Sequence, residues 1–193
     1  MIEISFVGPK EKEIHDIHQY VWVLQGSILV AVPNDETVKA GLTSSNSNGF
    51  SILDSNQQVL SLQDKTLIAT PYTDHVIPVT LEILPCRDPE YPVRDERIAV
   101  YLGISGKDLC LLCEESRGQP ILKLEDKKIM DLYSSQKAQK PFVFYQNQIG
   151  NTSTLESAAY PGWFICTSTE IDQPVTITQH IGPNHNIAFY LSP

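Results

Sequence analysis

The sequence lacks the features that mark membrane-spanning, signal-peptide-bearing and nucleic-acid-binding chains. No apolar run approaches the roughly 20 residues that span a bilayer, and the first ten residues have neither a basic start nor an apolar stretch of signal-peptide length. Basic residues are scarce, since 14 Lys and Arg stand against 23 Asp and Glu and give a net charge of -9. We therefore expect no nucleic-acid partner, no membrane partner, and synthesis in the cytoplasm without a signal peptide.

The chain is also poor in residues that carry redox or metal chemistry. Its four cysteines are Cys86, Cys110, Cys113 and Cys166. A cytosolic chain of this size is expected to keep them reduced. Cys110 and Cys113 form a C-x-x-C string inside a leucine-rich run, and on a strand this odd spacing points the two thiols to opposite faces. We interpret them as strand cysteines and not as a zinc or redox site.

No arrangement of residues predicts an active site. The histidine pairs His15/His18 and His180/His185 have no Glu or Cys beside them that would complete a metal site. Acidic runs such as residues 88–90 are expected in solvated turns, where nothing raises a carboxyl pKa for acid catalysis. The glycine-rich phosphate loop and the G-x-S-x-G nucleophile motif are missing. We therefore expect no metal, no cofactor and no enzymatic activity, and a protein that works by binding.

Short apolar runs separated by turn formers dominate the chain. They occupy residues 21–24, 28–32, 67–69, 79–84, 98–102, 109–113, 121–124, 142–145, 163–167, 175–178 and 187–191. Many short strands at spacings of roughly 8–12 residues favour an antiparallel sandwich or barrel. Apolar and polar residues alternate in the run 79–84, which predicts one buried and one wet face. The only helix candidate is the segment 125–133, so we predict an all-β fold.

One segment of twenty residues occurs twice. Residues 14–33 align with residues 52–71 at an offset of 38, and each copy predicts a hairpin with a short polar turn. The identical positions are Ile14/Ile52, Asp16/Asp54, Gln19/Gln57, Val21/Val59, Leu24/Leu62, Gln25/Gln63, Leu29/Leu67, Ala31/Ala69 and Pro33/Pro71. The polar stretch 42–49 between the copies predicts a flexible linker. We therefore predict an N-terminal extension at residues 1–50 and a main domain at residues 51–193.

The C-terminal part resembles the signature of the interleukin-1 family. Residues 155–167 followed by Val175 fit this signature at every position except the first, where Leu155 replaces Phe or Cys. Its residues include Ser157, Pro161, Trp163, Phe164 and Thr167. The resemblance implies a β-trefoil of twelve short strands, six closing a barrel and six capping it as hairpins. We expect the signature to be structural, with a turn at Pro161 and with Trp163, Phe164 and Ile165 packed in the barrel.

Further matches resemble the interleukin-36 and interleukin-37 branch. They lie at residues 21–24, 31–33, 78–80, 101–104, 129–133, 140–145 and 153–157. The resemblance spans residues 52–193 and implies a monomeric cytokine that binds a receptor ectodomain of the interleukin-1-receptor family. The receptor-bound complex would recruit an accessory receptor and start NF-κB-type signalling.

By similarity, receptor choice lies in two loops, residues 87–97 and 180–186. Candidate contact residues are Arg87, Glu90, Tyr91, Arg94, His180, Asn184 and His185. Aromatic residues and arginine dominate binding hot spots, which favours Tyr91, Arg94 and His185 as anchors. An agonist is favoured by residues 106–111 and 137–142. A receptor antagonist or suppressor stays open as the alternative, and so does an intracellular binding module.

Relatives in the interleukin-36 branch are activated by trimming to a start nine residues before an apolar-x-Asp motif. This chain has the motif twice. Ile52 and Asp54 would place the start at Thr43, inside the linker, whereas Ile14 and Asp16 would place it at Ser5. We expect an extracellular protease to cut the linker, and export without a signal peptide. We expect residues 52–71 to occupy the trefoil, although the first copy could compete and allow a swapped dimer.

Overall fold

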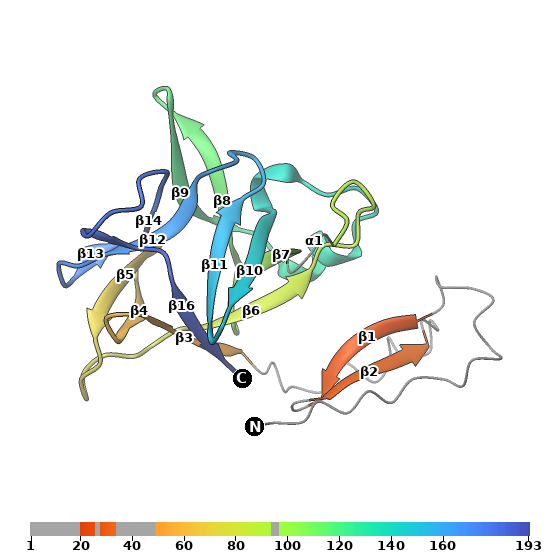
Figure 1. Cartoon of the computed structure of the whole chain (residues 1–193), viewed down its shortest axis with the longest axis horizontal. Coiled ribbons are helices and arrows are strands. Elements are labelled where there is room, and N and C mark those ends of the chain that lie inside the picture. The colour runs from red at the N-terminus through yellow and green to blue at the C-terminus, as the bar shows by residue number, and fades with distance from the viewer. Residues whose placement is uncertain (1–19, 26–27, 34–48, 94–96) are drawn as a thin grey trace. The chain divides into compact units, whose positions relative to one another are not determined.

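The computed structural model describes residues 20–25, 28–33, 49–93 and 97–193. The chain divides into two compact units, Met1–Asn46 and Ser47–Pro193. In the first unit, β1 (Tyr20–Gln25) pairs antiparallel with β2 (Ile28–Pro33) (Figure 1). Among the described residues these two strands form a sheet of their own, separate from the sheet of the second unit.

In its described residues, the second unit is a sheet of 14 strands with one short α-helix and one 3₁₀ helix. The strands are β3 (Phe50–Asp54), β4 (Gln58–Gln63), β5 (Thr66–Pro71), β6 (Thr80–Pro85), β7 (Arg97–Ile104), β8 (Leu109–Ser116), β9 (Gln119–Asp126), β10 (Phe144–Ile149), β11 (Thr152–Ser157), β12 (Phe164–Ser168), β13 (Gln173–Pro174), β14 (Thr176–Thr178), β15 (His185–Asn186) and β16 (Phe189–Ser192). The helices are α1 (Ile129–Ser134) and η3 (Lys140–Phe142). No helix of the described residues is long and apolar enough to cross a membrane.

Six of these strands pair into a closed ring. β3 pairs with β6 and β16, and the ring continues through β7, β10 and β11, each antiparallel to its neighbour. Because β3 and β16 are the first and last strands of the unit, their pairing closes the barrel and leaves the ring without an open edge. Three hairpins, β4–β5, β8–β9 and β12–β14, supply six further strands of three residues or more.

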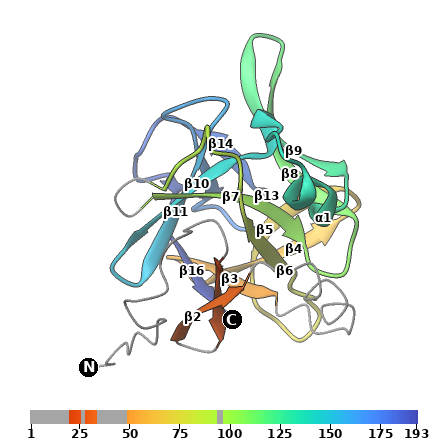
Figure 2. The same ribbon diagram turned by 90° about the vertical axis from the view of Figure 1, so that its right-hand side faces the viewer.

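The predicted β-trefoil of twelve strands is confirmed by this arrangement. The two strands beyond twelve, β13 and β15, are two-residue pairings with β5 and β12. The β8–β9 hairpin projects from the rest of the barrel in both views (Figures 1 and 2). It ends in Arg117 and Gly118, both at positive φ, as a two-residue type I′ turn requires.

The main hydrophobic core takes a buried residue from each ring strand. These residues are Ile52, Leu81, Leu102, Phe144, Leu155 and Phe189. Residues of the three hairpins, such as Leu60, Leu111 and Ile165, complete the same cluster. The barrel therefore has a single filled interior to which every strand pair contributes.

A second cluster covers the opposite face of β7 and β8. It joins Ala99, Tyr101 and Cys110 with Ile129 and Leu132 of α1 and Phe142 of η3. Cys110 belongs to this cluster and Cys113 to the main core, so the two thiols of the C-x-x-C string point to opposite faces, as their spacing predicts. Both are fully buried and unpaired.

The helix prediction is partly wrong. Glu125 and Asp126 end β9, and α1 starts only at Ile129. Pairing of Cys110 with Glu125 and of Leu109 with Asp126 keeps these carboxylates extended, so tertiary pairing overrides their local helix preference. The strand predicted at residues 142–145 likewise begins at Phe144, because residues 140–142 form η3.

Residues 52–71 lie in the trefoil. They form part of β3, which belongs to the ring, and the whole β4–β5 hairpin, which caps it. Their continuity with the Pro78–Thr80 segment favoured this placement. Val79 N–H donates to the Leu60 carbonyl at 2.8 Å and fixes that connection.

Candidate functional site

The loop that follows β6 is built around one buried carboxylate. Asp88 is only 7% exposed, and its Oδ1 accepts a hydrogen bond from Glu90 N–H at 2.9 Å. Its Oδ2 accepts from Ala138 N–H at 2.7 Å, which joins the loop to the segment before η3. These two main-chain donors hold the pKa of the Asp88 carboxyl below its usual value. The prediction that residues 88–90 form a solvated turn is therefore wrong for Asp88, although Pro89 and Glu90 are exposed.

Two of the predicted contact residues are exposed beside this carboxylate. Arg87 and Glu90 face solvent, and the Arg87 guanidinium lies 5.1 Å from the centre of the Tyr133 ring on α1. Tyr91 is half-buried, and its N–H donates to the Asp88 carbonyl at 2.9 Å. Residues 87–91 therefore form a fixed turn that presents the Arg87 cation and the Glu90 anion. Arg94 lies outside the described residues.

A chain of contacts runs from this loop to the signature turn. The Tyr91 and Tyr145 rings lie 6.4 Å apart, and the Arg97 guanidinium lies 4.9 Å from the centre of the Tyr145 ring. Arg97 also forms an ion pair with Glu156. Glu156 Oε1 accepts from Gly162 N–H at 2.8 Å. Sequence reasoning did not assign a role to Tyr145 or Glu156, although both lie within the stretches that matched the family.

The second predicted loop follows β14. His180, Asn184 and His185 are all exposed, as expected of solvated loop residues. The loop is held mainly through its backbone, since His185 N–H donates to the Gly182 carbonyl at 3.1 Å and Thr169 N–H to the Asn184 carbonyl at 3.3 Å. β15 then pairs His185 with Ser168 and Asn186 with Thr167.

The two loops lie on opposite sides of the barrel. The loop after β6 lies beside α1, at the right of Figure 1, whereas the loop after β14 lies on the left, beside β12 and β13. The structure therefore does not bring the two sets of candidate residues into one patch.

The apolar-x-Asp motif of the second copy is part of the core. Ile52 is 3% exposed and Asp54 is fully buried. Asp54 Oδ1 accepts from the N–H groups of Asn56 and Gln58 at 2.8 and 2.9 Å, and Oδ2 accepts from Gln58 Nε2 at 2.9 Å and Thr167 Oγ1 at 2.6 Å. The motif therefore ties β3 to β12 across the barrel. Thr43 and the first-copy positions Ser5, Ile14 and Asp16 lie outside the described residues.

The signature residues are mainly structural. Pro161 and Gly162 are the central residues of a type II turn, with φ of +83° at Gly162 and Trp163 N–H donating to the Tyr160 carbonyl at 3.1 Å. Ser157 is fully buried and its Oγ accepts from Tyr160 N–H at 3.1 Å.

Two aromatic residues of the signature differ in their packing. Trp163 packs against the main core, as predicted. The expected packing of Phe164 in the barrel is wrong, because its side chain is half-buried and belongs to neither core cluster. Ile165 packs in the main core, as predicted, and is 3% exposed, because alternation along β12 turns it inward and Phe164 away.

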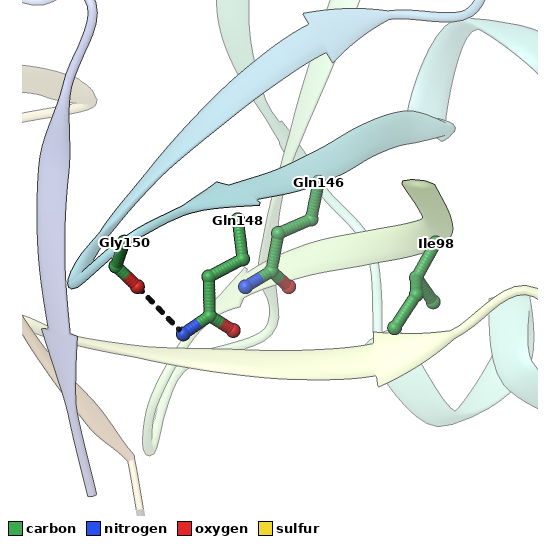
Figure 3. Close-up of a pocket in the computed structure, with 4 residues that line it drawn as sticks. All are labelled: Ile98, Gln146, Gln148 and Gly150. Carbon is green, nitrogen blue, oxygen red and sulfur yellow. Dashed lines mark hydrogen bonds between the residues drawn. The ribbon is translucent and has the colours of Figure 1, made fainter. Parts of the chain in front are cut away.

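One depression of the described surface has a lining without ionisable side chains. It has a volume of about 430 Å³ and is lined by Ile98, Gln146, Gln148 and Gly150 (Figure 3). None of these side chains titrates, and Gln148 Nε2 donates to the Gly150 carbonyl at 3.3 Å. No group of three or more His, Cys, Asp or Glu residues in the described ranges could hold a metal ion. Burial raises the pKa of the Cys110 thiol to about 11, so it is not an activated nucleophile.

Comparison with known proteins gives consistent family matches. The model of the family described as interleukin-1 / 18 matches residues 90–191. Human interleukin-36 alpha is 44% identical over 142 residues, which cover 74% of this chain and 90% of that protein. Mouse interleukin-36 beta is 39% identical over 165 residues, 86% of this chain and 89% of that protein. The NMR structure of the pro-inflammatory cytokine interleukin-36 alpha superimposes with a TM-score of 0.63 at 39% identity, over 78% of this chain and 97% of that one.

Two further relatives have names that indicate other roles or branches. Mouse interleukin-36 receptor antagonist protein is 56% identical over 80 residues, 42% of this chain and 51% of that protein. Human interleukin-37 is 36% identical over 151 residues, 77% of this chain and 69% of that protein. The chain is thus similar both to a pro-inflammatory cytokine and to a receptor antagonist.

Proposed function

Because the chain belongs to the interleukin-1 family, on its interleukin-36 and interleukin-37 branch, we propose that it is an agonist cytokine of an interleukin-36-type receptor. Members of this family are signalling ligands and not enzymes, they bind receptors of the interleukin-1-receptor family, and they act outside the cell. The finer proposal is that this chain binds the receptor, recruits the accessory receptor and starts NF-κB-type inflammatory signalling. Export without a signal peptide belongs to the same proposal.

The observation that carries this proposal is the fixed turn at residues 87–91, after β6. Asp88 holds the loop through two main-chain donors, so Arg87 and Glu90 are presented without the entropy cost of ordering a mobile segment. Arginine and tyrosine are the residue types that dominate binding hot spots. The 44% identity to human interleukin-36 alpha favours a receptor of the interleukin-36 type.

The separation of the two loops supports a binding partner that reaches around the barrel. A standard interface buries about 800 Å² on each partner. Since the loops after β6 and after β14 lie on opposite sides, a single compact patch would contact only one of them. An elongated receptor, or a receptor together with its accessory chain, would contact both.

Processing is proposed to act upstream of the Asp54 motif. Asp54 and Ile52 are locked in the core, so trimming at Thr43 would leave the motif and the barrel unchanged and remove only the preceding segment. An extracellular protease would cut within residues 42–49, whose Ser and Asn content is typical of nicking sites. N-terminal sequencing of the active species tests this, and an active form that retains Met1 would contradict it.

A reporter assay tests the agonist proposal. A form that starts at Thr43 is added to cells that carry an NF-κB reporter and the interleukin-36 receptor, and the expected result is a dose-dependent response. Arg87→Ala should weaken the response about tenfold or more, whereas Arg117→Ala, which removes an exposed arginine on the β8–β9 turn, should not. No response from a correctly folded protein would overturn the agonist proposal.

A receptor antagonist is the second candidate. The 56% identity over 80 residues to mouse interleukin-36 receptor antagonist protein favours it. In the same cells an antagonist would give no signal of its own and would block a known agonist in proportion to its concentration. Detection of this protein in the medium of stressed but intact cells would favour either candidate over an intracellular binding module.

A further inference from the structure

The hairpin of the first unit has the register of a hairpin in the barrel. In β1–β2 the partners are Tyr20↔Pro33, Val21↔Val32, Trp22↔Ala31, Val23↔Val30, Leu24↔Leu29 and Gln25↔Ile28. In β4–β5 they are Gln58↔Pro71, Val59↔Thr70, Leu60↔Ala69, Ser61↔Ile68, Leu62↔Leu67 and Gln63↔Thr66. Every pair of the first set becomes a pair of the second when 38 is added to both numbers. The repeated sequence therefore folds into the same hairpin twice, with the same turn length.

The positions at which β4–β5 enters the core have matching residues in β1–β2. Val59, Leu67 and Ala69 are 7%, 4% and 0% exposed, and the first copy has Val21, Leu29 and Ala31 at these positions. Ala69 has no exposed surface, so the most buried position of the hairpin has the same residue in both copies.

The remaining buried positions of β4–β5 have apolar or aromatic residues in the first copy. Ile68 is 8% exposed and corresponds to Val30, and Thr70 is 8% exposed and corresponds to Val32. Trp22 corresponds to Leu60, which is 2% exposed, and Tyr20 corresponds to Gln58, which is 3% exposed; both replacements add volume. The first copy thus has the apolar pattern that this place in the barrel needs.

Several bonds that hold β4–β5 in place use only its backbone. The Leu60, Leu67 and Ala69 carbonyls accept from the N–H groups of Val79, Val175 and Asp172 at 2.8, 2.8 and 2.9 Å. Gln58 N–H likewise donates to Asp54 Oδ1 at 2.9 Å. Another hairpin of the same register offers the same carbonyls and amides whatever its side chains are.

The hairpin stands outside the closed ring, so its replacement leaves the ring intact. β4 and β5 cap the barrel, whereas the ring consists of β3, β6, β7, β10, β11 and β16. The eight residues 72–79 connect β5 to β6, and β6 pairs with the start of β3 through Thr80 and Ser51. In the exchanged state, the 16 residues 34–49 would run from the end of β2 to the start of β3, which lies beside the start of β6. They are twice as many as residues 72–79. At about 3.3 Å each, they can therefore span the distance that residues 72–79 span between β5 and β6.

Similarity to a relative extends beyond the barrel unit. The alignment with mouse interleukin-36 beta covers 86% of this chain, which is more than residues 47–193 contain. The alignment therefore includes part of the first unit, as expected if a segment of that unit can also form part of a cytokine trefoil.

We propose that β1–β2 can take the place of β4–β5 in the barrel of the same molecule, so that the full chain has two alternative cap hairpins. The exchange replaces Gln58 with Tyr20 and loses the bonds from Gln58 Nε2 to Asp54 Oδ2 and the Ser168 carbonyl, both 2.9 Å. It also removes the buried Gln58 Oε1, which has no hydrogen-bond partner in the described structure. At the turn, Ser27 replaces Lys65, so the ion pair of Lys65 with Asp126 is lost and the displayed surface changes.

Complementation within the full chain tests the proposal independently of receptor signalling. Leu60→Asp places a carboxylate at a core position of β4, and Trp22→Asp does the same at the matching position of β1. We expect each single variant to keep a cooperative thermal transition and a native near-ultraviolet circular dichroism spectrum, because the other hairpin fills the place. We expect the double variant to lose both signals.

Two results would overturn the proposal. If Leu60→Asp alone unfolds the chain, β1–β2 does not replace β4–β5. If the double variant stays folded, position 60 tolerates the carboxylate and no replacement is needed. Light scattering of the Leu60→Asp variant adds a further check, because the exchange within one molecule predicts a monomer at all concentrations, and a dimer would mean that a second copy supplies the hairpin.

Discussion

Two aspartates organise two distant regions of the trefoil with the same hydrogen-bond pattern, but one joins strands and the other positions a surface loop. Asp54 lies at the end of β3, and Asp88 lies in the loop after β6. In each, one carboxylate oxygen accepts from an N–H two residues further along the chain. The second oxygen reaches a segment far away in sequence, Thr167 for Asp54 and Ala138 for Asp88.

The difference between them lies in the partners of the second oxygen. Asp54 is fully buried and receives two side-chain donors, so it joins strands of the barrel. Asp88 keeps 7% exposure and receives only main-chain donors, so it positions a surface loop without depending on other side chains. A buried carboxylate in this fold can therefore serve either folding or the geometry of a binding surface, and its neighbours decide which.

Removal of Asp54 should have the largest effect. Asp54→Ala leaves Thr167 Oγ1 and the Asn56 and Gln58 amides without an acceptor, and Gln58 Nε2 keeps only its bond to the Ser168 carbonyl. We expect a loss of about 3–4 kcal/mol in the free energy of unfolding. Urea denaturation measures it. Thr167→Val is the matched control, since it removes one donor with little change of shape and should cost about 1–2 kcal/mol. Equal losses for the two variants would show that the carboxylate does not organise the cluster.

Removal of Asp88 should loosen the loop and leave the barrel folded. We expect Asp88→Ala to weaken receptor binding at least tenfold, since the loop must then be ordered on binding. Cys86 precedes the loop and is half-buried, whereas Cys110, Cys113 and Cys166 are fully buried. Thiol labelling should therefore become faster at Cys86 alone. Unchanged labelling and binding would show that Asp88 does not hold the loop.

Substitutions of exposed residues compare the two loops directly. Arg87→Ala and His185→Ala remove exposed side chains from the loop after β6 and the loop after β14. If both loops touch the receptor, each change should weaken binding about 10- to 100-fold without a shift in the thermal transition. Surface plasmon resonance with the receptor ectodomain measures this, with Arg117→Ala as the control. A loss from only one loop would assign the receptor contact to that side of the barrel.

Acidification should have the smallest effect on the loop after β6. The Asp88 pKa is lowered by the Ala138 and Glu90 amides, so the stability that its carboxylate contributes is present above the ordinary pKa of about 3.9. This contribution is lost only as the pH falls through the lower pKa of the folded state. The amide resonance of Ala138 should stay constant from pH 7 to about pH 4 and move below it, whereas Asp88→Asn should remove that movement. Movement near neutral pH would contradict the assignment.

Much of the strand pattern could be predicted from local sequence, because alternation and turn residues act over a few positions. The opposite faces of Cys110 and Cys113 follow from their spacing, and the Pro161 turn follows from the Pro-Gly dipeptide in the family signature. The end of β9 at Asp126 could not be predicted in this way. Glu125 and Asp126 favour a helix or turn locally and become extended only because they pair with β8.

The candidate site was predictable in part. The exposure of Arg87, Glu90 and His185 agrees with their positions in polar loops. The burial of Asp88 was missed, because its partner Ala138 is 50 residues away and an acidic run without a visible partner indicates solvent. Sequence also gave no sign that the two loops lie on opposite sides of the barrel.

The order of strands and turns and the repeated hairpin were determined by the amino-acid sequence itself, because period, turn chemistry and identity are local properties. The tertiary structure alone decided which carboxylates are buried, which strands close the ring and that β4–β5 fills the cap. These outcomes depend on contacts between residues far apart in the chain, such as the pairing of β3 with β16 and the bond from Ala138 to Asp88, which no local pattern encodes.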